Sequence, residues 1–255
     1  MKIGSKRFRS AINGVARSVA FHPATPWGPD LLQPSLFLGK RVIVLGPAQT
    51  VFDDLNGTDV DAYDVVVRLN NGLLLSERDP EVLGRRTDLL LHNSREHGPR
   101  SAGAIPADLL KARRVGMLAF PYWRKNEHRQ AYYAKKAELR RVDGPPLRLI
   151  PLDMMTAMRI DIGDRPPSVG ATAIMFFLDA PIAEIAIHGF TFFETAYAAG
   201  YNDAVASPED ARAWVDARGT HEPTSEKQAI RTRLSRTEVA KVILGQGVRR
   251  HLFEK

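Results

Sequence analysis

Short apolar runs alternate with helical stretches along most of the chain. The apolar runs are continuous and rich in branched side chains, and they lie at 41–46, 65–69, 87–93, 113–120, 147–152 and 184–190. Such runs are typical of strands that helices cover on both faces. Helical composition marks the stretches 99–112, 126–141, 168–180 and 225–244. The alternation predicts an α/β fold, a single Rossmann-like domain with a mainly parallel sheet and helices on both faces.

The first 38 residues differ from the rest of the chain. Residues 21–38 contain four prolines, which predicts an irregular lead-in. Residues 1–21 are basic, with apolar residues at helical spacing. That pattern favours a surface helix packed on the domain, or a short amphipathic helix lying on an anionic membrane. No linker is recognisable after residue 40, so we expect a basic helix and lead-in over 1–38 and one domain over 39–255.

Composition excludes some classes of chemistry. The chain has 255 residues and no cysteine, which rules out disulfides, thiolate metal sites and cysteine nucleophiles. The net charge of +7 gathers at the ends, where residues 1–40 hold six Lys/Arg against one Asp and residues 227–255 hold eight against two Glu. Basic ends serve anionic lipid, nucleic acid or an anionic substrate, or are solvated tails. No apolar run approaches the roughly 18 residues of a membrane span.

Polar and small residues follow most of the predicted strands. In a doubly wound sheet the ligand binds at the carboxyl ends of the strands, so these residues are candidates for the site. They include Gly46, Gln49, Asn70, Asn93, Ser94 and Phe190. Asn70 ends the strand in "YDVVVRLNNG", and strand alternation places Asn71 on the other side. Arg68 shares the parity of Asn70 but lies deeper, and we expect a buried salt bridge for it.

Two familiar phosphate motifs are absent from the sequence. Neither G-x-G-x-x-G nor G-x-x-x-x-G-K-[ST] occurs, which argues against a nicotinamide cofactor and a P-loop. The pair Asp59 and Asp61 resembles carboxylates that hold a divalent metal. It precedes a strand instead of following one, so we interpret it as a surface turn. We therefore expect no metal and no cofactor.

Two predicted helices start with residues that suit phosphate binding or general-base catalysis. Pro167, Ser168 and Gly170 open an apolar helix whose first N–H groups suit a phosphate, although a simple capped helix has the same pattern. His221 lies just before the last predicted helix and Glu226 in its first turn. A histidine there suits a general base at neutral pH, although an isolated histidine is more often an ordinary surface residue.

Taken in order, these pieces resemble the sialyltransferase family, glycosyltransferase family 29. Residues 41–94, "RVIVLGPAQTVFDDLNGTDVDAYDVVVRLNNG" through "GRRTDLLLHNS", are similar to its long motif. Residues 166–190, "PPSVGATAIMFFLDAPIAEIAIHGF", are similar to its short motif. His221 and Glu226, separated by four residues, match its very short motif. The resemblance covers about residues 40 to 235.

The resemblance implies a variant glycosyltransferase A-type fold and a metal-independent, inverting sialyltransferase. The donor would be a CMP-sugar, acting as co-substrate, and the acceptor a hydroxyl of a glycan or glycolipid. Asn70 would bind the donor, Ser168 and Gly170 the phosphate, and Phe190 would lie beside the nucleotide. His221 would be the catalytic base, with Glu226 supporting the loop or orienting His221.

The sequence also departs from that family's pattern. Pro47 and Ala48 stand where an asparagine usually follows the turn glycine, Val169 replaces a threonine, and the bridging cysteines are missing. For the family's third motif, Tyr197 and Tyr201 are the candidates to bind the phosphate. Without an anchor before the domain, the resemblance fits a bacterial-type cytoplasmic protein whose basic ends touch the inner membrane face.

Three functions stay open at this point. The first is transfer of sialic acid or a related ulosonic acid, including Kdo from CMP-Kdo. The second is a non-catalytic nucleotide- or RNA-binding module, which the basic ends suggest. Aromatic residues are not interleaved with the basic tracts, so we expect no nucleic-acid partner. The third is a fold that is kept while activity is lost.

Overall fold

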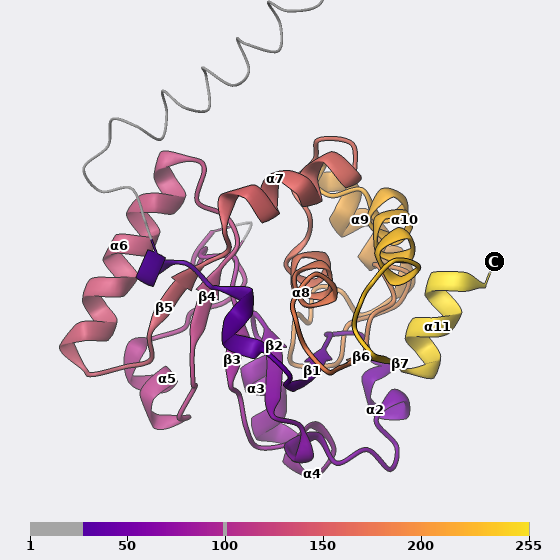
Figure 1. Cartoon of the computed structure of the whole chain (residues 1–255), viewed down its shortest axis with the longest axis horizontal. Helices are drawn as coiled ribbons and strands as arrows, with labels where there is room; N and C mark the ends of the chain where they lie inside the picture. The colour runs from indigo at the N-terminus through magenta and orange to yellow at the C-terminus, as the bar shows by residue number, and fades with distance from the viewer. Residues whose placement is uncertain (1–27, 99–100, 255) are drawn as a thin grey trace, which may run out of the picture.

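The structure is a computed structural model that describes residues 28–98 and 101–254 (Figure 1). The basic helix predicted at 1–21 lies outside these residues. The described part of the chain forms one seven-stranded sheet in the order β5-β4-β3-β2-β1-β6-β7, and every neighbouring pair is parallel. The strands are β1 (Arg41–Leu45), β2 (Val65–Leu69), β3 (Leu89–Leu91), β4 (Leu118–Phe120), β5 (Leu147–Leu149), β6 (Glu184–His188) and β7 (Lys241–Leu244). The predicted α/β fold with a parallel sheet is confirmed.

Helices cover both faces of this sheet (Figure 1). One set comprises α7 (Leu152–Asp161), α8 (Val169–Leu178), α10 (Pro223–Leu234) and α11 (Gln246–Phe253). The other comprises α2 (Val51–Asp54), α3 (Gly72–Arg78), α4 (Pro80–Leu83), α5 (Ala107–Ala112) and α6 (Asn126–Arg141). Helix α9 (Pro208–Arg218) lies beside α10 in Figure 1. The short 3-10 helices within residues 28–98 and 101–254 are η1 (Gly28–Asp30), η2 (Pro34–Phe37) and η3 (Val60–Ala62).

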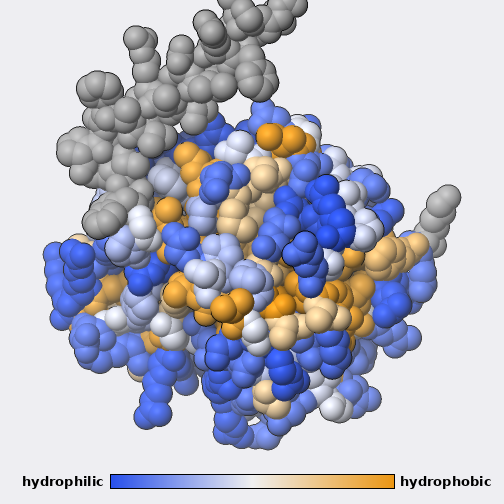
Figure 2. Space-filling view, viewed as in Figure 1, coloured by the Kyte–Doolittle hydropathy of each residue, from blue (hydrophilic) through white to orange (hydrophobic). Residues whose placement is uncertain are grey.

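Side chains of the central strands alternate between two hydrophobic clusters. In β2, Val65, Val67 and Leu69 pack with α8, whereas Val66 packs with α2 and α3 on the opposite face. All five residues of β2 are buried, which explains the continuous apolar run in the sequence. The surface differs from this buried interior. In Figure 2, hydrophilic side chains cover much of the surface and apolar ones gather near its middle.

The last predicted helix is wrong beyond residue 234. The chain leaves α10 at Leu234 and forms β7, which pairs with β6 from Glu184↔Lys241 to Ile187↔Leu244. The branched residues Val242 and Ile243 suit an edge strand, but their helical spacing with the preceding residues concealed it. Tertiary pairing with β6 decides between the two structures.

Two other helical predictions need correction. The stretch 99–112 is helical only from Ala107, and its described residues before that are irregular. Helix α7 was not predicted at all, although it starts directly after β5. Pro151 occupies its N-cap position, and exposed polar residues dilute its apolar pattern. The helices at 126–141 and 168–180 are confirmed as α6 and α8.

Arg68 does not form the expected salt bridge with any described residue. Arg68 is 2% exposed, and its guanidinium donates to the carbonyls of Leu83, Gly84 and Arg86 and to the Thr87 hydroxyl. Burial lowers its pKa to about 10, against the raising influence of Asp61 and Asp88. Arg68 therefore ties β2 to the loop before β3, and carbonyl dipoles take the place of a carboxylate.

The described part of the lead-in packs against the sheet. Leu32 is fully buried and its N–H donates to the carbonyl of Leu149 at the end of β5. Phe37 contacts the rings of Phe176 and Phe177 on α8. The division after residue 38 stays a prediction, with residues 28–37 already contributing to the core.

The direction of the sheet connections reverses at β1. Strands β2 to β5 follow β1 on one side, and β6 and β7 lie on the other. A ligand crevice is expected at such a switch point, beyond the carboxyl ends of the strands. In the part of the chain that the structure describes, all helices are too short or too polar to cross a bilayer.

Candidate functional site

A cleft opens at the switch point, above the carboxyl ends of β1, β2, β3, β4 and β6. It holds about 940 Å³ of space, including the part open to solvent. We call it the switch-point cleft. Its lining comprises Pro47, Ala48, Leu69, Asn70, Asn93, Tyr122, Ser168, Val169, Gly170, Ala171, Gly189, Phe190, Thr191, Phe192, Phe193, Tyr197, Tyr201, Trp214, Val215, His221 and Glu226.

Asn70 connects three parts of this cleft. Its side-chain oxygen accepts from the N–H of Asn93 at 3.1 Å, and its amide nitrogen donates to the Tyr201 hydroxyl at 3.3 Å. Tyr201 is 8% exposed, and burial raises its pKa to about 12, so its hydroxyl is protonated at neutral pH. The side-chain amide of Asn71 also reaches this loop and donates to the carbonyl of Tyr201 at 2.9 Å. One amide side chain thus fixes the loops after β2, β3 and β6 relative to each other.

Glycines allow the walls of the cleft to approach closely. A Cβ atom on Gly46 would lie 2.2 Å from the carbonyl oxygen of Gly189, so the ends of β1 and β6 need glycine there. A Cβ atom on Gly170 would lie 2.9 Å from the ring of Phe190. The first turn of α8 therefore packs against the loop after β6, and both of these residues line the cleft.

A buried carboxyl group from α10 contacts the start of α8. Glu226 is 1% exposed and accepts from both the N–H and the hydroxyl of Ser168, at 2.6 and 2.7 Å. Burial raises the pKa of Glu226 to about 7, and the two bonds from Ser168 oppose that rise. The Ser168 oxygen also accepts from the N–H of Ala171, as an N-cap does. Both hydrogen-bonding capacities of this hydroxyl are therefore used within the protein.

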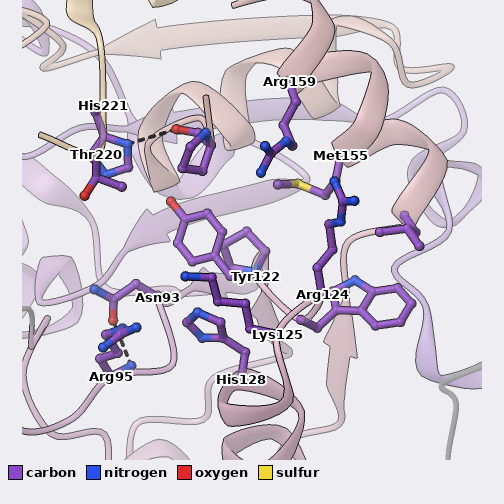
Figure 3. A pocket seen from close by; sticks show the side chains of 14 residues that line it. Asn93, Arg95, Tyr122, Arg124, Lys125, His128, Met155, Arg159, Thr220 and His221 are labelled. Atoms are coloured by element: carbon purple, nitrogen blue, oxygen red, sulfur yellow. Dashed lines mark hydrogen bonds between the residues drawn. The ribbon is translucent and has the colours of Figure 1, made fainter. Parts of the chain in front are cut away.

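His221 has a defined tautomer. Its Nδ1 lies 3.0 Å from the carbonyl oxygen of Pro166, and a carbonyl oxygen only accepts hydrogen bonds (Figure 3). The proton of the neutral ring is therefore on Nδ1, which makes Nε2 the basic nitrogen. The ring of Phe193 stacks on the imidazole, with 6.4 Å between the ring centroids and 10° between the ring planes. Glu226 lies 3.8 Å from Nδ1, near enough to stabilise an imidazolium.

A second cavity of about 950 Å³ adjoins the switch-point cleft, and we call it the α6–α7 cavity (Figure 3). The two share Asn93, Tyr122 and His221. The Tyr122 hydroxyl donates to the carbonyl of Pro167 at 2.6 Å, which holds the ring between the two spaces. The remaining lining residues are Arg95, Pro121, Trp123, Arg124, Lys125, His128, Leu152, Met155, Arg159, Pro166 and Thr220.

Most residues predicted from the sequence meet in the switch-point cleft. Those that line it are Asn70, Asn93, Ser168, Gly170, Phe190, Tyr201, His221 and Glu226. Gly46 lies beneath the cleft, at the contact of β1 with β6. Ser94 lines neither cavity and instead contacts His128, with its hydroxyl 3.1 Å from Nδ1. Gln49 is exposed and lines neither cavity, so the geometry gives it no place at the site.

Several lining residues were not predicted from the sequence. Trp214 and Val215 come from α9 and reach the cleft only through the path of the chain after β6. Arg159 comes from α7, which was not predicted. Arg124 and Lys125 were not predicted either, whereas Pro121 to Trp123 just before them are expected at this edge because they directly follow a strand, here β4.

The loops after three strands contain residues in the left-handed region of backbone conformation. Asn70 has φ of 47° after β2, Ser94 has 66° after β3, and Phe192 and Phe193 have 51° and 66° after β6. Non-glycine residues rarely adopt such angles, and they concentrate at functional sites. Phe193 is the residue that stacks on His221, so one of these conformations directly shapes the site.

Comparison with known proteins bears on the fold. No family model and no curated protein matches the sequence. Among solved structures, the chain is similar to a mammalian sialyltransferase, both alone and in complex with Gal-beta-1-3GalNAc-ortho-nitrophenol. Both comparisons have a TM-score of 0.50 and cover 94% of this chain and 80% of the other, at 14% and 15% identity. A form of the sialyltransferase CST-II in complex with CMP gives a TM-score of 0.49 at 10% identity, with 80% of each chain covered. The chain therefore has a sialyltransferase-like fold.

Proposed function

We propose that the protein is a glycosyltransferase that uses a CMP-sugar, such as CMP-sialic acid or CMP-Kdo. One observation carries this proposal. The three segments that resemble the sialyltransferase motifs are distant in sequence, yet residues from each line one cleft, and His221 lies where that cleft meets a second cavity. A transferase of this kind needs a donor site and an acceptor site that meet at a base.

The nucleotide phosphate would bind at the start of α8. The first N–H groups of a helix have no intrahelical acceptor and carry the positive end of the helix dipole. Ser168 takes the N–H of Ala171, whereas Val169 and Gly170 both line the cleft and have N–H groups in the first turn. The tyrosine hydroxyls of Tyr197 and Tyr201 come from another wall of the cleft and are further donors.

The proposed reaction is a direct displacement with inversion. The oxygen of an acceptor hydroxyl attacks the anomeric carbon and forms the new glycosidic bond, while the bond from that carbon to the phosphate oxygen breaks. The electron pair of the broken bond leaves with CMP. His221 Nε2 takes the proton of the attacking hydroxyl, and the carbonyl of Pro166 and the carboxyl of Glu226 stabilise the resulting imidazolium.

We propose that this chemistry needs no metal ion. CMP has a single phosphate, and fixed N–H and hydroxyl donors can stabilise the charge that develops on it. Glu226 acts as a positioning residue, because it holds Ser168 at the start of α8 and lies 3.8 Å from His221 Nδ1.

A panel of CMP-sugars tests the proposal. The protein is incubated with each donor in the presence of EDTA, and CMP release is measured with and without acceptor glycans. We expect CMP release from a CMP-ulosonic acid, and an acceptor should accelerate this release. Calorimetry with CMP provides the second readout. No release from any donor together with no CMP binding would exclude this function, whereas CMP binding without turnover would favour a fold that is kept while activity is lost.

A further inference from the structure

Charge is distributed unequally between the two adjoining cavities. Four cationic side chains line the α6–α7 cavity, namely Arg95, Arg124, Lys125 and Arg159. Among its described lining residues there is no Asp or Glu. The switch-point cleft has the opposite character, since none of its described lining residues is Lys or Arg. The cations are thus concentrated on the side of His221 away from the start of α8.

Two of these cations have ion-pair partners. Arg95 pairs with Glu127 at 2.7 Å and Arg159 with Asp164 at 2.9 Å. Both carboxylates lie outside the lining and are well exposed, at 58% and 87% of the side chain, so solvent screens them. The side chains of Arg124 and Lys125 make no hydrogen bond or ion pair with other described residues. The cavity therefore keeps a net positive charge.

The base of the cavity is apolar and rigid. Trp123 is 7% exposed and donates its indole N–H to the carbonyl of Ile150 at 2.8 Å. Met155 is 4% exposed and also lines the cavity. His128 is fixed by Ser94, and burial followed by the nearby Arg95 lowers its pKa, so the imidazole contributes polar contacts and little charge at neutral pH. An apolar base with a polar and cationic rim suits a sugar, whose faces are apolar and whose edges are polar.

The lining has two distinct ends in Figure 3. His221, Thr220, Asn93 and Arg95 lie on one side of Tyr122, and Arg124, Arg159 and Met155 lie on the other. An acceptor that places one hydroxyl at His221 and extends over Tyr122 reaches Arg124 and Arg159. The space of about 950 Å³ includes the part open to solvent, so the rest of a longer saccharide can extend outward from the cavity.

We propose that the α6–α7 cavity binds an anionic saccharide, with a carboxylate or phosphate group held by Arg124 and Lys125 and supported by Arg159. This inference rests on the proposed function, in which the same saccharide is the acceptor. Guanidinium groups bind carboxylate and phosphate through paired, charge-assisted hydrogen bonds, so both anions have the chemistry that this rim recognises.

The first experiment compares matched acceptors in transfer assays. Three saccharides of similar size are used: a neutral one, one that ends in a carboxylate-bearing sugar, and one that carries a phosphate. We expect the wild type to prefer an anionic acceptor in kcat/KM, and the preferred anion identifies the source. In the double variant R124Q/K125Q the ratio of anionic to neutral kcat/KM should fall about tenfold or more, because charge-assisted hydrogen bonds are lost.

The matched control is Arg140→Gln, which removes an exposed cation at the far end of α6. This variant should keep the wild-type ratio. If the double variant keeps the ratio as well, or if the wild type shows no preference for either anion, the proposal is wrong. It is also wrong if R124Q/K125Q mainly raises the KM of the CMP-sugar, since the cations would then serve the donor.

A binding experiment separates this proposal from the proposed function. The same saccharides are titrated by calorimetry into the protein without any donor, at low and high salt. Tighter binding of the anionic saccharide that weakens with salt and is lost in R124Q/K125Q supports the inference even when no CMP-sugar reacts. Equal binding of neutral and anionic saccharides overturns it, even when CMP release shows that the protein is a transferase.

Discussion

The switch-point cleft and the α6–α7 cavity are neighbours of similar size that are built in different ways. The first is formed by strand ends, the start of α8 and short polar side chains, and Glu226 is the only Asp or Glu among its described lining residues. The second is formed by long cationic side chains from the loops after β3 and β4 and from α7, above an apolar base. They meet at Asn93, Tyr122 and His221.

The difference shows two ways of binding an anion. Backbone N–H groups and fixed hydroxyls need no charge, because the helix holds them in place before the ligand arrives. Long cationic side chains reach from the rim and adapt to the position of the anion, at the expense of side-chain entropy. A phosphate whose position must be fixed for reaction suits the first site, and an acceptor with variable extension suits the second.

The largest effect is expected from His221→Ala, which tests whether the two cavities serve one reaction. Loss of the base should lower transfer by about a hundredfold or more, while CMP affinity stays close to that of the wild type. Turnover assays and calorimetry measure the two quantities. His97→Ala, at an exposed position, is the control and should keep full activity. If transfer by the His221 variant is unchanged, the place where the two cavities meet is not the reaction centre.

A smaller effect is expected from Asn70→Ala, which tests the donor side alone. The change removes the bonds to Asn93 and Tyr201 and places alanine at φ of 47°. CMP affinity should fall by about tenfold, and the unfolding free energy by roughly 1–3 kcal/mol. Calorimetry and urea unfolding measure these changes.

Asn70→Gly separates the two causes, because glycine adopts positive φ without strain. We expect it to bind CMP as weakly as the alanine variant and to be less destabilised. Acceptor binding in the α6–α7 cavity should stay near the wild-type value in both variants. If CMP affinity survives both changes, the assignment of the donor to the switch-point cleft is wrong.

The smallest effect concerns the carboxyl group in the switch-point cleft. The pKa of Glu226 rises from 4.5 to about 7 on folding, so the folded protein holds this proton more tightly than the unfolded chain between these values. Stability from this group is present below about pH 4.5 and is lost as the pH rises through about 7. Across that window the wild type should lose roughly 1–3 kcal/mol of unfolding free energy through Glu226.

Glu226→Gln should remove this part of the pH dependence, as urea unfolding at pH 5 and pH 8 will measure. The exposed Glu238→Gln is the matched control and should keep the wild-type slope. A slope in the Glu226 variant equal to that of the wild type would show that Glu226 is not the group responsible. The carboxyl would then be ionised throughout, and the contrast in charge between the two cavities would be larger than we describe.

The sequence predicted the switch-point cleft better than the α6–α7 cavity, for a physical reason. Residues directly after parallel strands meet at one edge of the sheet, so Asn70, Asn93 and Phe190 could be assigned to a site from their positions alone. His221 and Glu226 follow no strand, and only their spacing and the resemblance to the sialyltransferase motifs connected them to it. Arg159 belongs to a helix that was not predicted, and nothing in the local pattern joins it to Arg124.

By itself, the sequence determined the α/β class, the buried central strands and the start of α8. The spacing of apolar residues within each segment indicates whether it is a strand or a helix and which residues it buries. Only the tertiary structure decided what lies beside what. Pairing with β6 made residues 241–244 a strand, and backbone carbonyls replaced the expected salt bridge of Arg68. The loops after β3 and β4 and the helix α7 together brought four cations to one cavity. These contacts join residues far apart in the chain, and they stabilise the protein only once the sheet has formed.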